Sequence, residues 1–283
     1  MVKAMKNILI PTDFSKNSWN AIEYALKFFE NSCCNFYLLH VNTINTLVVA
    51  ETTYMPTQEV IEEAFIKPAN VNLKEAINRI KSISKNDKHK FFTLTDYNYF
   101  IDSIRKHVSE KKIDIIVMGT KGASGLKKLI VGSNTGDVLT RVHCSTLVVP
   151  ENAKYVKLKE IAFPTDFSSF YSLELLQPIL EILDQYQASI NILHINKKGV
   201  TLNLDQQINK GYLEDYFANN NFNFHHLTNN NIESAIQSFV EKRKVNLITM
   251  VAKNLNYFQR ILFHPTIKEI SYHTDIPFLV LHE

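Results

Sequence analysis

The chain of 283 residues contains the same series of segments twice. The run NILIPTDFS at 7–15 returns as EIAFPTDFS at 160–168, and YLLHVN at 37–42 returns as NILHIN at 191–196. Two shorter runs recur 132 positions further on, DIIVM at 114–118 as NLITM at 246–250, and TLVVP at 146–150 as FLVLH at 278–282. Self-similarity of this kind indicates two copies of one fold, each of about 140 residues.

Within each copy, short β-rich runs alternate with segments of helical length. This alternation predicts a parallel sheet with crossover helices, so each copy is expected to be a five-stranded α/β sandwich. The predicted strands are 7–11, 35–41, 90–95, 114–118 and 146–150 in the first copy, and 160–164, 189–195, 222–227, 246–251 and 277–282 in the second. The predicted helices lie near 15–31, 70–85, 98–111 and 133–143, and near 168–186, 204–219, 230–243 and 265–273.

The short polar segment 150–158 is the predicted linker, which gives domains at 1–150 and 158–283. Ser15 is a suitable N-cap for the first helix, and Asp13 stands where a carboxylate would meet exposed helix N–H groups. The stretch 42–69 lacks clean periodicity and is longer than its counterpart in the second copy. It is therefore predicted to be an insertion, either a surface loop or a segment that folds over a ligand.

Composition and charge argue for a globular protein that binds neither nucleic acid nor membrane. Hydrophobic residues make up 45% and charged residues 21% of the chain, which is ordinary for a soluble domain. The net charge of +3 is spread among acidic residues, so polyanion binding is not indicated. No apolar stretch approaches the ~20 residues that cross a bilayer, and the start of the chain leads directly into a strand without a secretory signal.

The three cysteines, Cys33, Cys34 and Cys144, have no metal-ligand spacing and fit a reducing compartment. Cys33 and Cys34 are interpreted as small residues at a helix end, with oxidant sensing as the second possibility.

Glycine is concentrated in one place. Five of the seven glycines lie between Gly119 and Gly136, from the end of a predicted strand into a predicted helix. Glycine is used where φ is positive or where something approaches the main chain closely, and a loop between a strand and a helix N-terminus is a common phosphate site. Gly119 and Gly122 at the strand end, with Gly132 and Ser133 at the helix start, could direct backbone N–H groups at one anion.

The ends of the first two predicted strands supply the other parts of a site. If strands one and four are neighbours, Pro11, Thr12 and Asp13 face the glycine loop across the crevice of a doubly wound sheet, and Val41 lies on the same rim. An apolar surface, a carboxylate and a phosphate cradle are what a nucleoside phosphate requires. Lys121, Lys127 and Lys128 could also reach phosphates, although exposed lysines usually only solvate a surface.

These residues resemble the universal stress protein family in its tandem two-domain form. The resemblance rests on the PTDFS start, the LLHV second strand and the spacing G-x2-G-x9-G-S. It implies an adenine nucleotide α-hydrolase-like, Rossmann-like fold, binding of ATP or a related adenine nucleotide, and a cytoplasmic location. The ligand contacts that it implies are Pro11, Thr12, Asp13, Val41, Met118, Gly119, Thr120, Lys121, Gly122, Gly132, Ser133 and Asn134.

The second copy departs from this pattern at the cradle. The positions that match Gly119, Gly122, Gly132 and Ser133 are Val251, Asn254, His264 and Pro265. Proline has no N–H, and His264 adds a side chain where the main chain should approach the phosphates. Pro265 still suits the first turn of a helix. The second copy is thus expected to keep the fold without the anion site, with Asp166 capping the helix that follows it.

Catalytic and metal-binding patterns are lacking in the sequence. There is no G-x-x-x-x-G-K-[ST] loop, kinase signature or nucleophile elbow, and no spacing typical of a metal site, so Mg²⁺ would arrive only with the nucleotide. His40 and His194 are interpreted as ordinary strand-end residues. Ser124, Ser133 and Thr135 are possible phosphoacceptors without an evident base, so slow ATP hydrolysis or autophosphorylation stays a second hypothesis.

The glycines could instead form a tight turn that binds nothing, and the protein would then be an interaction scaffold. The final strands, 146–149 and 278–281, are apolar edges that invite pairing. Such pairing could join the two copies within the chain, or two chains as a homodimer.

Overall fold

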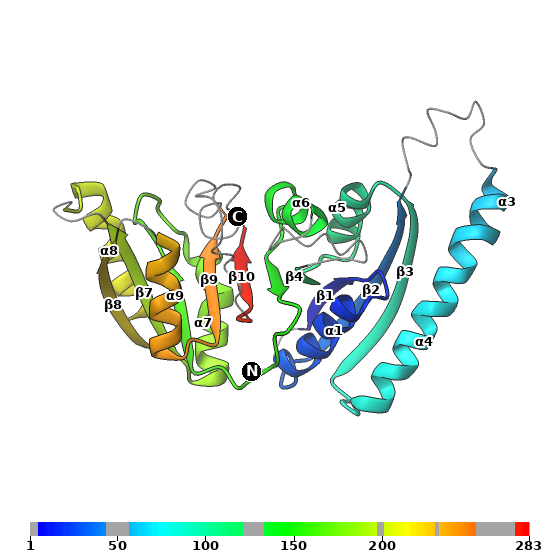
Figure 1. The fold of residues 1–283 in the computed structure, drawn as a ribbon, viewed down its shortest axis with the longest axis horizontal. Helices are drawn as coiled ribbons and strands as arrows, with labels where there is room; N and C mark the ends of the chain where they lie inside the picture. Colours follow the sequence, from blue (N-terminus) through cyan, green and yellow to red (C-terminus); the bar gives the residue numbers. More distant parts are fainter. Residues whose placement is uncertain are drawn as a thin grey trace. The chain divides into compact units, whose positions relative to one another are not determined.

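The computed structural model describes residues 5–43, 57–120, 133–196, 201–229, 232–252 and 275–282 (Figure 1). These residues divide into two compact units, the first ending at Asn152 and the second beginning at Ala153. No helix among them has the length and apolar character that a bilayer span requires.

The first unit is a parallel sheet in the order β3-β2-β1-β4-β5 with helices on both faces. Helices α1 and α4 lie side by side on one face, and α5 packs with α6 on the other. Its elements are β1 (Lys6–Pro11), α1 (Lys16–Phe28), β2 (Cys34–Thr43), α3 (Gln58–Ile61), the π-helical η1 (Glu62–Ile66), α4 (Lys67–Ile83), β3 (His89–Asn98), α5 (Phe100–Glu110), β4 (Ile115–Gly119), α6 (Ser133–Arg141) and β5 (Thr146–Val149).

The second unit repeats this topology, with parallel strands in the order β8-β7-β6-β9-β10. The α/β fold in two tandem copies that the sequence predicts is thereby confirmed. Its elements are β6 (Glu160–Pro164), α7 (Leu173–Tyr186), β7 (Ser189–Asn196), α8 (Leu204–Phe217), β8 (Asn221–Thr228), α9 (Ile232–Arg243), β9 (Leu247–Val251) and β10 (Phe278–Leu281). The predicted helix at 265–273 lies outside the described residues.

The repeat extends to unusual backbone conformations. Phe14 and Phe167, which occupy the same place in the PTDFS turn, have φ values of 62° and 55°. Lys112 and Lys244, which precede β4 and β9, have φ values of 48° and 53°. Positive φ is uncommon for residues other than glycine, so its recurrence at matched positions shows that the two copies share turn geometry as well as strand order.

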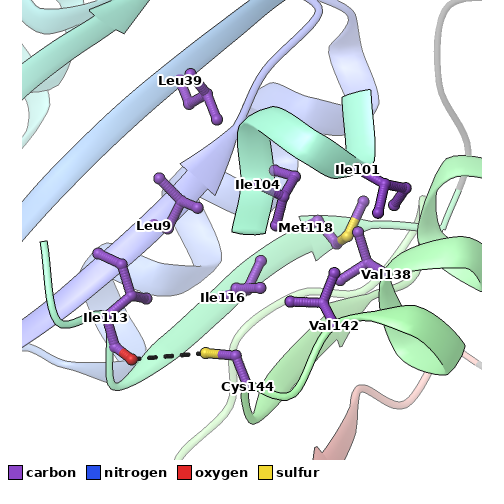
Figure 2. Close-up of a cluster of buried hydrophobic side chains, with 10 residues drawn as sticks. All are labelled: Leu9, Leu39, Ile101, Ile104, Ile113, Ile116, Met118, Val138, Val142 and Cys144. Atoms are coloured by element: carbon purple, nitrogen blue, oxygen red, sulfur yellow. Dashed lines mark hydrogen bonds between the residues drawn. The ribbon is translucent and has the colours of Figure 1, made fainter. Parts of the chain in front are cut away.

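Buried aliphatic side chains hold α5 and α6 against the sheet of the first unit. Figure 2 shows Leu9 from β1 and Ile116 from β4 facing Ile104 of α5, and Val138 of α6 closes the same cluster. These four side chains are fully buried, and each such burial stabilises the fold by about 2 kcal/mol. The cluster thus fixes the position of α6, which is the helix that follows the glycine loop.

The prediction that 42–69 is an insertion without regular structure is wrong for its second part. Residues 58–83 form one continuous helical run through α3, η1 and α4, while 44–56 lie outside the described residues. Pro68 explains why the sequence pattern is obscured there, because proline lacks an N–H and its ring conflicts with the carbonyl four residues back. The π-helical turn just before Pro68, in which the Lys67 N–H bonds to the Glu62 carbonyl, absorbs this conflict.

The first helix of the second unit begins later than predicted. The sequence predicts a start near 168, but the helix starts at Leu173, with Ser172 as N-cap accepting a hydrogen bond from the Leu175 N–H at 3.2 Å. In the first unit, Ser15 caps α1 as expected, accepting from the Ser18 N–H at 3.2 Å. The first turn of α1 thus has no helical counterpart in the second unit.

Candidate functional site

The candidate site lies where the order of strands reverses in the first unit. Strand β1 pairs with β2 on one side and with β4 on the other, so successive crossovers depart in opposite directions from the β1 and β4 pair. Ligands of doubly wound sheets bind outside the carboxyl ends of strands at such a reversal. Pro11 ends β1 and Gly119 ends β4, and these two strand ends therefore share one edge of the sheet.

The turn after β1 is held by its own polar groups. The Thr12 N–H donates to the Leu39 carbonyl at 2.8 Å, and the Thr12 hydroxyl accepts from the Phe14 N–H at 3.1 Å and donates to the Ser18 hydroxyl at 3.0 Å. The carboxylate of Asp13 accepts from the Ser15 N–H at 3.0 Å. Thr12 is therefore a residue that shapes the turn, while half-buried Asp13 sets the direction of the entry into α1.

An aromatic pair forms one wall of this turn. The ring of Phe14 stacks on His40 with centroids 4.6 Å apart, and His40 Nδ1 donates to the Thr12 carbonyl at 2.8 Å. His40 therefore has a structural contact with the turn after β1. Phe14 remains 37% exposed, so its ring lies at the surface beside the ends of β1 and β2.

A hydrogen bond joins the two ends of the glycine loop. The hydroxyl of Thr135, in the first turn of α6, donates to the Gly119 carbonyl at 2.8 Å, and the Thr120 N–H donates to the Val149 carbonyl at 3.2 Å. Thr135 is 3% exposed, so its hydroxyl serves this contact and is not presented as a phosphoacceptor. The N-terminus of α6 is thereby brought next to the end of β4.

Gly119 has a packing role of its own. A Cβ at this position would lie 3.2 Å from the carbonyl oxygen of Asn17, in the first turn of α1, which is closer than an ordinary contact. The lack of a side chain at Gly119 thus lets the start of α1 approach β4, which is a packing reason for this glycine and not the tight turn considered from the sequence.

Replacement of Gly119 by Ala is expected to destabilise the protein by about 1–3 kcal/mol, because the backbone of α1 must shift to admit the methyl group. Gly211, in α8, is the matched control, since a Cβ there meets nothing within 4 Å. Gly211→Ala is expected to stabilise by about 0.5–1 kcal/mol through helix propensity. Urea unfolding of both variants tests this difference of sign, and equal effects would contradict the close approach at Gly119.

The predicted ligand residues are only partly within the described chain. Val41 is half-buried near the end of β2, Met118 is 6% exposed and packs into the cluster of Figure 2, Thr120 is 5% exposed, and Asn134 is exposed. Lys121, Gly122 and Gly132 lie outside the described residues, and Ser133 is described only as the first residue of α6. Asn17, Phe14 and the hydroxyl of Thr135 have positioning roles that the sequence did not indicate, since each acts through a contact that only the fold reveals.

The corresponding place in the second unit is filled by its own side chains. Phe167 is fully buried and stacks on His194 at 5.0 Å, whereas Phe14 is exposed. Two side chains of α8 are bonded to this turn, Gln206 donating to the Asp166 carbonyl and Asn209 to the Phe167 carbonyl, both at 2.8 Å. Helix α8 therefore covers the turn after β6.

The prediction that Asp166 caps the following helix is wrong. Its carboxylate accepts from the Ser168 N–H at 3.0 Å and from the Ser168 hydroxyl at 2.8 Å, within the turn itself. Ser172 is the N-cap of α7. The residue before it, Tyr171, lies outside the helix, and its hydroxyl is bonded to the Thr165 hydroxyl at 3.0 Å.

Burial of His194 predicts a pH dependence of stability in the second unit. Burial lowers the pKa of His194 below its ordinary 6.5, against the opposing effect of the Thr165 carbonyl, and the charge of His226 adds to the lowering. Since the unfolded chain then binds more protons than the folded one below pH 6.5, this stability is complete above that pH and is lost as the pH falls through the folded pKa. Urea midpoints between pH 5 and 8, compared with those of His194→Gln, test this. An unchanged slope in the variant would contradict it, since His225 and His89, whose pKa values burial also lowers, would then account for the effect.

A charged cluster in the first unit has an apolar counterpart in the second. The buried ring of His107 on α5 bonds through Nε2 to the carboxylate of Asp96 at 2.8 Å, and Lys106 contacts the same carboxylate at 3.1 Å. Burial raises the pKa of Asp96, but the Lys106 hydrogen bond and the charges of His107 and Lys106 outweigh it and hold the pKa below its usual range. Strand register matches Asp96 with Leu227, and α9 matches His107 with Phe239.

The described residues contain no cluster of His, Cys, Asp or Glu side chains that could hold a metal ion. Burial raises the pKa of both Cys34 and Cys144 to about 12. Oxidation proceeds through the thiolate, which these high pKa values disfavour. Cys34 is buried as a small packed residue, but it begins β2 and does not lie at a helix end as predicted.

Comparison with known proteins places the chain in a family. A model of the universal stress protein family matches residues 5–150. Universal stress protein MJ0531 of Methanocaldococcus jannaschii is 28% identical over 151 residues, which cover 53% of this chain and 84% of that protein. Universal stress protein MJ0577 of the same organism is 28% identical over 155 residues, covering 51% and 94%.

Solved structures match the whole fold. A universal stress protein from Archaeoglobus fulgidus, 18% identical, has a TM-score of 0.69 and is covered over 97% of both chains. A functionally unknown protein, PA1789 from Pseudomonas aeruginosa, 13% identical, has a TM-score of 0.62 over 98% of this chain and 92% of its own. These likenesses show the two-copy fold, and the family model spans more than half of the sequence. The chain belongs to the universal stress protein family.

Proposed function

We propose that the first unit binds ATP or a related adenine nucleotide, and that binding regulates the protein in a stress response without turnover. Val41 and the Pro11–Asp13 turn contact the adenosine part. Backbone groups of Gly119–Gly122, other than the Thr120 N–H that bonds to the Val149 carbonyl, and backbone N–H groups of Gly132–Asn134 bind the phosphates, with Met118 and Lys121 beside them. Mg²⁺, where it takes part, enters with the phosphates. Membership of the family also favours a cytoplasmic setting.

The observation that carries this proposal is the meeting of β1, β4 and α6 at one edge of the sheet. The Thr135 hydroxyl bonds to the Gly119 carbonyl at 2.8 Å, so the N-terminus of the nine-residue α6 stands beside the end of β4. The partial positive charge of a helix N-terminus favours anions, and Pro11 ends the neighbouring strand. The residues present therefore fit a nucleoside phosphate.

The second unit acts as a structural partner that does not bind nucleotide. Burial of Phe167 and the two hydrogen bonds from α8 to the turn after β6 leave that turn covered by protein. Pairing of the units through their final strands, and a further homodimer, belong to the same proposal and rest on the apolar character of those strands. The protein partner that reads the nucleotide state is not specified by these residues.

Mass spectrometry of small molecules released from denatured, purified protein tests the proposal, together with ATP titration of protein freed of ligand. An adenine nucleotide in the released fraction and saturable binding of ATP are expected. A folded protein that releases none and gives no heat with ATP would overturn the proposal and favour a scaffold without nucleotide. Phosphate release on incubation with ATP would instead identify a slow ATPase.

A further inference from the structure

A cleft of about 310 Å³ lies between α1 and α4 in the first unit, on the face of the sheet opposite α5 and α6. Ile22 and Ala76 are aliphatic parts of its lining, and Trp19 is the sole tryptophan of the chain. Its complete lining is Thr12, Phe14, Ser18, Trp19, Ile22, Asn72, Glu75, Ala76 and Arg79. The cleft has the size of a site for a small organic molecule.

Two polar groups of the lining lack the partners that their chemistry calls for. The guanidinium carbon of Arg79 lies 3.6 Å from the centre of the Trp19 ring, and no carboxylate among the described residues pairs with Arg79. The indole N–H of Trp19 is buried without a hydrogen-bond acceptor. Because the indole nitrogen is covered by protein, the guanidinium of Arg79 is the donor that an anionic ligand in the cleft can meet.

The second unit has no comparable arrangement at the matched positions. Ser172 stands in the place of Trp19, and Tyr171 stands in the place of Ser18. The phenol of Tyr171 is bonded to the Thr165 hydroxyl. The helical turn that carries Trp19 is absent there, since α7 begins at Leu173. The ring of Phe170, in the segment before α7, lies 5.2 Å from the ring of Tyr212 in α8. The tryptophan of the cleft is thus particular to the first unit at these matched positions.

We propose that the cleft between α1 and α4 is a second ligand site, for a small carboxylate with an apolar body. The carboxylate pairs with the guanidinium of Arg79, which lies over the Trp19 ring and has no carboxylate partner among the described residues. Ile22, Ala76 and the ring of Phe14 contact the apolar body. The carboxylate of Glu75, also in the lining, suits an ammonium group, so the ligand is either an amino acid or the corresponding acid without the amino group.

Fluorescence of Trp19 gives a direct measurement in the full-length protein without nucleotide. Titrations with L-leucine and with 4-methylpentanoate are compared with isoamylamine, which has the apolar body but no carboxylate. A saturable change in emission with at least one of the two carboxylates, and none with the amine, is expected. Binding of leucine alone identifies an amino acid, and Glu75→Gln then removes the preference for it; binding of 4-methylpentanoate identifies the deaminated acid.

Arg79→Gln is expected to weaken this binding about tenfold or more, because a charged hydrogen bond is lost. Lys81→Gln, on the same helix but outside the lining, is the matched control and should bind as the wild type does. Calorimetry repeats the titration on Ala76→Trp, whose side chain should fill the cleft and abolish binding while circular dichroism stays native. Lack of saturation with both carboxylates in the folded wild type, or equal affinity in Arg79→Gln, would overturn the proposal. Neither result bears on the proposal of nucleotide binding, which is tested separately by titration with ATP.

Discussion

Replacement of Gly132 by Trp is expected to weaken the binding of ATP by about a hundredfold or more. In the proposed cradle, backbone N–H groups at the start of α6 approach the phosphates, and an indole at position 132 would hold the phosphates away from them. Loss of two charged hydrogen bonds of about 1.5 kcal/mol each is sufficient for this factor. Calorimetric titration with ATP of the wild type and the variant, both first freed of ligand, gives the measurement.

Gly211→Trp is the matched control, because it makes the same substitution at an open position of α8 where a Cβ meets nothing within 4 Å. It should bind ATP with the affinity of the wild type. If Gly132→Trp also bound ATP as the wild type does, the glycines would be turn residues and the cradle would be excluded.

Single replacements in the Asp96 and His107 pair are expected to destabilise the first unit by about 3 kcal/mol each. Asp96→Leu leaves the buried ring of His107 without the carboxylate that bonds to Nε2 at 2.8 Å. His107→Phe removes one partner of a carboxylate of which only 12% of the side chain is exposed. Breaking a buried pair on one side costs far more than replacing both of its members by apolar groups.

The double variant Asp96→Leu with His107→Phe is therefore expected to recover most of the lost stability. The second unit already has this combination, with Leu227 and Phe239 at the matched positions. Urea unfolding of the two single variants and the double variant gives the coupling between the positions. Losses that simply add in the double variant would contradict the view that Asp96 and His107 are energetically coupled.

The fold was predictable because the repeat and the pattern of short apolar runs are strong signals. Each predicted strand is present within a few residues. Strands β1 and β4 are neighbours, as the site prediction assumed. The site prediction depends on that neighbour relation, since Pro11 and Gly119 are far apart in the sequence but end adjacent strands.

Other features could not be read from the sequence, because they depend on contacts between distant residues. The helical run 58–83 was hidden by Pro68, which the π-helical turn accommodates. The late start of α7 depends on the contact of Tyr171 with Thr165, although both copies contain the same PTDFS run. The different exposure of Phe14 and Phe167 depends on the amides of α8, which bond to one turn and have no equivalent at the other in the described chain.

Nucleotide binding is expected to be asymmetric, with a single site in a chain that contains two copies of the fold. Isothermal titration of the full-length, ligand-free protein with ATP tests this most directly through the stoichiometry. One molecule of ATP bound per chain is the expected result. Two molecules per chain would show that the second unit binds as well, and no binding at all would contradict the assignment of the first.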